Sequence, residues 1–217
     1  AFSSGNAFRI VVGATPLLWP LLFQVDFGMS AFASGALIIA CAAGDLTMKL
    51  FAVRVLRRFV FRRTLVYNGF LVGLAVLACA TWRSSTPVAL LAATLMVVGI
   101  VRSVEFGAFN ALTYVDVPPE KMSAATSLAG TLQQMSFGLG VAFAALALHV
   151  AAYWDHGAAS TTYTVDDFRA AFFASAALSF VGALGFTRLH PRAGAAASGQ
   201  TGTVWARRQK SPKASTG

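Results

Sequence analysis

Six long apolar stretches run through this chain, and they constrain its fold more than any other feature. A helix that crosses a bilayer needs roughly 20 largely apolar residues, and each stretch is close to that length or longer. The expected spans are residues 8–27, 31–53, 64–82, 87–114, 122–154 and 168–189. This pattern predicts an all-α integral membrane protein with six transmembrane helices.

The composition agrees with a membrane protein. Hydrophobic residues make up 57% of the 217 residues and charged residues only 12%, about half the usual charged share of a soluble domain. A soluble chain of this size needs more polar surface to cover its core. The net charge is +9, and a strongly positive charge is common in nucleic-acid-binding domains. Here, however, the positive charges lie in clusters beside apolar runs, so we expect no nucleic-acid partner.

The positions of lysine and arginine predict the orientation, because cytoplasmic connections carry an excess of both. If the amino end is cytoplasmic, 14 of the 17 basic residues lie on the cytoplasmic side. Arg83 and Arg169 fall outside, and Arg102 lies within the fourth span. An even number of spans then returns the chain to the same side. We expect a multi-pass protein of the cell's inner (plasma) membrane with both ends of this segment in the cytoplasm.

Two regions are expected along the chain. Residues 1–190 form the six-helix bundle, and residues 191–217 form a basic, disordered cytoplasmic tail rich in small and polar residues. Residues 1–5 resemble the end of a loop, so we expect a fragment of a longer chain. The sequence has no GxxxxGK[ST], HExxH or GxSxG motif, so we predict neither an enzyme nor a cofactor or metal site.

The fourth span contains two ionisable residues, Arg102 and Glu105, which their spacing places on one helix face. Charged groups at membrane depth are costly and normally face a cavity or a partner. Two interpretations stay open: a substrate or proton path, or an oppositely charged pair that joins two helices. Phe109 and Asn110, farther along this span, belong to the same candidate path.

The fifth span contains Gln133 and Gln134 among small residues. Each amide needs hydrogen-bond partners away from lipid. We expect one to face a central cavity and the other a neighbouring helix, and we include both in the substrate or proton path.

Two further features suggest moving parts. Pro16 and Pro20 remove two backbone donors from the first span and should bend it, either as a gate or as a static kink. Asp45, near the cytoplasmic end of the second span, can pair with Arg54 or Arg58 as a conformational latch. A solvated acid at the membrane surface is the alternative.

Seven segments follow one another in a familiar order. They are PLLWPLLFQ (16–24) with GMS (28–30), Lys49 with RRFVFRR (57–63), RSVEF (102–106), NAL (110–112), DVPPEKMSAATSL (116–128), TLQQ (131–134) and LGVA (139–142). Over residues 5–190 this set resembles the carboxy-terminal half of the major facilitator superfamily, in particular its fourteen-helix drug:proton antiporters. Val60, Glu105 and Trp19 depart from that family, where Gly, Gln and Leu are usual.

The resemblance implies a proton-coupled exporter of small, often amphipathic organic molecules that works by alternating access. Its partners would be a small-molecule substrate, protons, the lipid bilayer and the missing amino-terminal half of the chain, which would hold the proton-carrying acids. The alternative function is a non-transporting six-helix membrane subunit with an assembly or regulatory role. An intramembrane enzyme is disfavoured, because no nucleophile is matched with a base.

Overall fold

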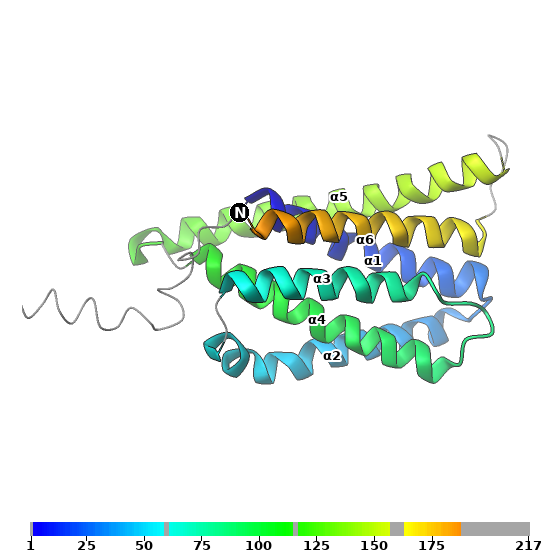
Figure 1. Ribbon diagram of the computed structural model, residues 1–217, viewed down its shortest axis with the longest axis horizontal. Helices are drawn as coiled ribbons and strands as arrows, with labels where there is room; N and C mark the ends of the chain where they lie inside the picture. The colour runs from blue at the N-terminus through cyan, green and yellow to red at the C-terminus, as the bar shows by residue number, and fades with distance from the viewer. Residues whose placement is uncertain (1, 59–60, 115–116, 157–162, 188–217) are drawn as a thin grey trace, which may run out of the picture.

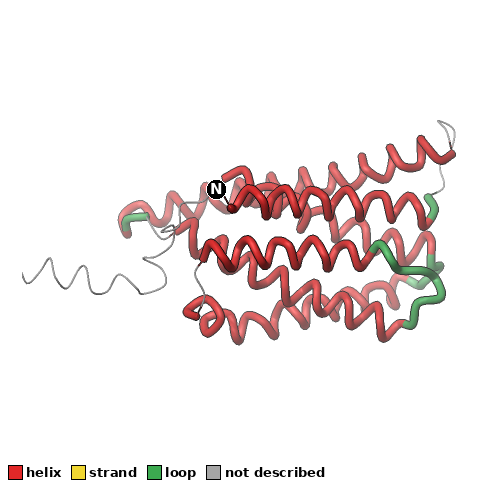
Figure 2. The backbone as a smooth tube through the Cα atoms, in the orientation of Figure 1, coloured by secondary structure: helices red, strands yellow, loops and turns green. Residues whose placement is uncertain are grey.

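The computed structural model describes residues 2–58, 61–114, 117–156 and 163–187, and these form a bundle of six long helices (Figure 1). Figure 2 shows helices and loops in this part of the chain, and no strand. The long helices are α1 (Phe2–Leu21), α2 (Ala31–Arg58), α3 (Phe61–Cys79), α4 (Val88–Tyr114), α5 (Met122–His156) and α6 (Val165–Thr187). Two short helices are η1 (Leu22–Asp26), a π-helix, and η2 (Pro119–Lys121), a 3₁₀-helix.

The predicted all-α fold of six helices is confirmed. Within the described residues, five helices are long and apolar enough to cross a membrane, and α3 contributes a shorter apolar stretch, Leu65–Cys79. Large apolar side chains such as Phe32 (88% exposed) and Trp154 (81% exposed) cover the outside of the bundle. Such a surface suits lipid, because hydrocarbon chains replace water as the solvent there.

Successive helices run in opposite directions, so the bundle has two ends (Figure 1). We call the end where α1 begins the amino end and the opposite end the far end. Helix α1 packs against α5 and α6, α3 packs against α4 and α6, and α2 packs mainly against α4. The basic residues at the end of α2 extend that helix to Arg58, past the expected end at residue 53, because arginine is a good helix former.

The first helix departs from regular geometry around its two prolines. Pro16 has no N–H to donate to the Val12 carbonyl, and the Thr15 hydroxyl donates to that oxygen instead at 3.0 Å. Directly after Pro20 the helix widens into the π-helix η1. Gly28, with φ of +63°, then turns the chain toward α2. The backbone is therefore irregular from Pro16 to the far end, and the bend expected at the two prolines stays a prediction.

Aromatic side chains fill the far end of the bundle. Trp82, which follows α3 and is 3% exposed, stacks on Phe23 of η1 with 5.6 Å between ring centroids. Its other contact is edge-on to Phe172 of α6 at 6.3 Å. Aromatic pairs in these geometries add stability beyond their buried area. They join η1 and α6 to the segment after α3 at this end of the bundle.

Helices α2 and α4 approach so closely that their backbones touch. A Cβ atom built on Gly99 of α4 would overlap the Cys41 carbonyl oxygen, and one built on Gly44 of α2 would overlap the Met96 carbonyl oxygen. Glycine is therefore required on both sides, as is common where membrane helices pack backbone to backbone.

Replacing Gly99 by alanine should force α2 and α4 apart. We expect Gly99→Ala to cost about 1–3 kcal/mol of stability through overpacking, seen as a lower melting temperature of the purified protein in detergent. Gly35→Ala is the matched control, because a Cβ atom at Gly35 meets nothing within 4 Å. A melting temperature for Gly99→Ala equal to that of Gly35→Ala would contradict the close packing.

Candidate functional site

A cavity of about 840 Å³ opens between four helices, α1, α2, α4 and α5. Its lining residues come from the middle of these helices and from their parts nearer the amino end. They are Val12, Gly13, Pro16, Asp45, Lys49, Arg102, Ser103, Phe106, Gly107, Asn110, Gln133, Gln134, Phe137, Gly138 and Val141. A pocket of this size, mostly apolar with a few polar groups, is typical of small-molecule sites.

Four of the six residues predicted for the substrate or proton path meet at this cavity. Arg102 lies at the middle of α4, and Asn110 lies about two turns farther along the same helix. Both Gln133 and Gln134 of α5 line the cavity as well. The expectation that only one glutamine faces the cavity is therefore wrong. The cavity is wide enough at α5 to reach two neighbouring positions of one helix.

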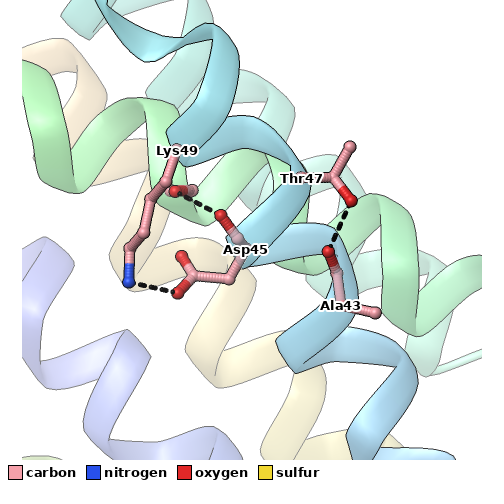
Figure 3. Close-up of polar contacts among 5 residues, drawn as sticks. Ala43, Asp45, Thr47 and Lys49 are labelled. Carbon is pink, nitrogen blue, oxygen red and sulfur yellow. Dashed lines mark hydrogen bonds and ion pairs between the residues drawn. The ribbon is translucent and has the colours of Figure 1, made fainter.

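An ion pair lies at the edge of this cavity on α2. The Lys49 ammonium is 3.0 Å from a carboxylate oxygen of Asp45, one helical turn away (Figure 3). The Ser103 hydroxyl of α4 donates to the Asp45 backbone carbonyl at 3.1 Å, which ties α2 to α4 at the same level. A second bond in Figure 3, from the Thr47 hydroxyl to the Ala43 carbonyl at 2.7 Å, stays within α2.

Within the described residues, Asp45 forms its ion pair with Lys49, a partner that was not expected. The side chains of Arg54 and Arg58 lie outside the described residues, so the latch between them and Asp45 stays a prediction. Lys49 is four residues from Asp45, a spacing that favours an ion pair on a helix. The spacing of Asp45 and Lys49 in the sequence could therefore have predicted this ion pair.

Glu105 lies outside the cavity and is fully buried, with an exposed fraction of 0%. Its Oε2 accepts a hydrogen bond from the Asn68 side-chain amide of α3 at 3.1 Å. The same amide nitrogen donates to the Val101 carbonyl at 2.7 Å. Glu105 Oε1 has no hydrogen-bond partner. Glu105 therefore joins α4 to α3, and it does not face the polar lining of the cavity.

The suggested ion pair between Arg102 and Glu105 is wrong for the described part of the chain, where no such pair occurs. Side chains three positions apart on a helix point in directions that differ by about 60° around its axis. Helix α3 packs on the side of α4 that carries Glu105. Arg102 consequently faces the cavity while Glu105 faces Asn68. The missed signal was Asn68 itself, a lone amide within the apolar third span.

Phe109 also lies away from the cavity, in a small apolar cluster with Leu65, Ala108 and Phe186. The guanidinium carbon of Arg9 lies 4.7 Å from the centroid of the Phe109 ring, which is a cation–π contact. Arg9 is only 3% exposed. The cluster joins α3, α4 and α6, and the Arg9 contact links the amino-end part of α1 to it. Of the two prolines, Pro16 lines the cavity, and Pro20 is not among the lining residues.

Comparison with known proteins identifies the family. A family model described as Major Facilitator Superfamily matches residues 1–214. A candidate multidrug resistance protein, MdtD, from Klebsiella pneumoniae is 31% identical over 216 residues, which is 95% of this chain and 43% of that protein. MdtD from Citrobacter koseri is 33% identical over 172 residues, or 74% of this chain and 35% of that protein. The chain thus spans less than half the length of these relatives.

Removing the Glu105 side chain should weaken the contact between α3 and α4. We expect Glu105→Ala to cost about 2–4 kcal/mol, because it opens a cavity and takes away an acceptor of Asn68. Glu105→Gln keeps both the shape and the acceptor, so its melting temperature should stay near that of the parent protein.

The matched control is Glu120→Ala, which removes an exposed glutamate from η2. Equal melting temperatures for Glu105→Ala and Glu120→Ala would show that the bond to Asn68 does not stabilise the bundle.

Proposed function

This chain belongs to the major facilitator superfamily, and we propose that it forms the carboxy-terminal half of a proton-coupled exporter of small, drug-like organic molecules. Membership makes it a multi-pass membrane transporter rather than an enzyme. The relatives carry the name multidrug resistance protein, which supports export of organic compounds. Their greater length supports a second, amino-terminal half of the same protein.

The observation that carries the proposal is the cavity at the middle of the bundle, where a few polar side chains lie in a mostly apolar wall. Arg102, Asn110, Gln133 and Gln134 come from two helices and converge on one apolar-walled space. Polar side chains are expensive at membrane depth and usually mark a substrate or ion path. In alternating access, two bundles rock about a site at the midplane. We assign this cavity as the contribution of the present bundle to that site.

The direction in which the cavity opens follows from the orientation proposed from the basic residues. With both ends of the segment in the cytoplasm, the amino end of the bundle faces the cytoplasm of an inner-membrane protein. The lining of α2 and α4 lies in the middle and amino-end parts of these helices, whereas the far end is filled by Trp82 and its aromatic partners. The proposed state is therefore open to the cytoplasm and closed on the outer side.

Helix α1 is the proposed moving part. Pro16 and Pro20 interrupt its backbone hydrogen bonds, and the π-helix η1 follows directly. π-Helical turns and prolines are places where helices bend. Bending at this point would change how the far end closes over the cavity. The latch between Asp45 and Arg54 or Arg58 is the proposed conformational contact at the cytoplasmic side, and Asp45 also pairs with Lys49 within α2.

Transport should depend on the two glutamines. In the full-length protein, in vesicles with an imposed proton gradient, we expect Gln133→Ala/Gln134→Ala to lower dye efflux at least tenfold, because the cavity loses both amides. Gln24→Ala is the matched control: Gln24 is exposed on η1 and is not among the residues lining the cavity, so it should retain the parent rate.

Two results would contradict the proposal. Efflux that continues unchanged when a protonophore collapses the gradient would rule out proton coupling. Equal efflux by the double variant and the Gln24→Ala control would remove the cavity from the transport path.

A further inference from the structure

The cavity has an excess of positive charge. Its charged lining residues are Asp45, Lys49 and Arg102. Asp45 already pairs with Lys49 at 3.0 Å. Arg102 interacts with Asp45 through space, but the described residues include no ion pair of Arg102 with any carboxylate. Two cations therefore share one carboxylate within the described lining.

Glu105, the acid on α4, is not available to Arg102. Glu105 is fully buried on the side of α4 that meets α3, where the Asn68 amide holds its Oε2. The guanidinium of arginine stays charged and presents five N–H donors in a planar fork that matches a carboxylate. A charge of this kind at membrane depth needs a counter-ion. The open space beside Arg102 can hold one.

The rest of the lining suits an apolar body attached to that counter-ion. Phe106 lies one helical turn from Arg102 on α4, and Phe137 faces the same cavity from α5. Val12, Pro16 and Val141 add further apolar wall, while Asn110 and the two glutamines supply hydrogen bonds. The volume of about 840 Å³ accommodates a drug-sized molecule.

We propose that Arg102 binds the carboxylate of an amphipathic organic anion whose aromatic or aliphatic body lies between Phe106 and Phe137. This inference rests on the proposed transport function and specifies its substrate class: organic acids in preference to lipophilic cations. Arg102 is then the specificity-determining residue of the site, since the amide and aromatic contacts are available to charged and neutral molecules alike.

The test uses the full-length protein in proteoliposomes and three fluorescent probes. The probes share one aromatic scaffold and differ only in carrying a carboxylate, a carboxamide or an ammonium group. We expect the parent protein to transport the carboxylate probe fastest. Arg102→Gln should slow that probe at least tenfold and change the carboxamide probe less than twofold. Arg102→Lys, which keeps the charge, should retain more carboxylate transport than Arg102→Gln.

The control is Arg83→Gln, which removes an exposed arginine that lies outside the cavity and should leave all three rates unchanged. Size-exclusion profiles of each variant verify folding, and the Arg102→Lys result holds even if Arg102→Gln misfolds.

Three outcomes overturn the proposal. If Arg102→Gln slows all three probes equally, Arg102 serves a structural pair, such as one with an acid of the amino-terminal half. If the parent protein transports the ammonium or carboxamide probe but not the carboxylate probe, this inference fails while the transporter function stands. If none of the three probes moves under a proton gradient, the proposed function fails together with the inference.

Discussion

Hydrocarbon offers no hydrogen-bond partners, and this constraint decides where every polar side chain of the bundle can lie. Besides hydroxyl groups that bond a carbonyl of their own helix, two groups of polar side chains in the described structure meet this constraint. Some polar groups are locked between helices: Asn68 holds Glu105, Ser103 bonds the Asp45 carbonyl, and Ser179 bonds the Gly69 carbonyl at 3.2 Å. Others gather at one cavity, where Arg102, Asn110 and the two glutamines share a space with the Asp45–Lys49 pair. The first group holds the helices together, and we propose that the second group contacts the substrate.

This division explains how one bundle can be both rigid and functional. Contacts through Gly44 and Gly99 bring α2 and α4 together, and the Glu105–Asn68 bond fastens α4 to α3. Helix α1 is different, because its prolines leave backbone carbonyls to be satisfied by other means, as Thr15 does for Val12. The irregular helix thus borders the cavity on one side, and the firmly packed pair α2 and α4 borders it on the other. We propose that α1 bends at its prolines while the α2–α4 contact stays intact, although α1 itself packs backbone to backbone on α5, where a Cβ atom on Gly140 would overlap the Ile10 carbonyl oxygen.

Much of the fold could be predicted from the sequence, because six long apolar runs, five of them in helices of spanning length among the described residues, admit few alternatives. The cavity set was also largely predictable, since Arg102, Asn110, Gln133 and Gln134 are conspicuous in apolar surroundings. The residues that each polar side chain contacts could not be predicted in the same way. Whether Glu105 meets Arg102 or Asn68 depends on which helix packs against α4, and spacing along one helix does not contain that information. The Asp45–Lys49 pair is the opposite case, a local contact whose spacing was readable in the sequence.

We propose that the substrate binds in the cavity between α1, α2, α4 and α5. Thiol labelling of Asn110→Cys in the full-length protein tests it most directly, and the native Cys41 and Cys79 of this segment are buried, with exposed fractions of 2% and 1%. The account predicts that a water-soluble thiol reagent labels Cys at this position from the cytoplasmic side. A saturating transported substrate should slow that labelling severalfold. Labelling at the same rate with and without substrate would contradict the claim.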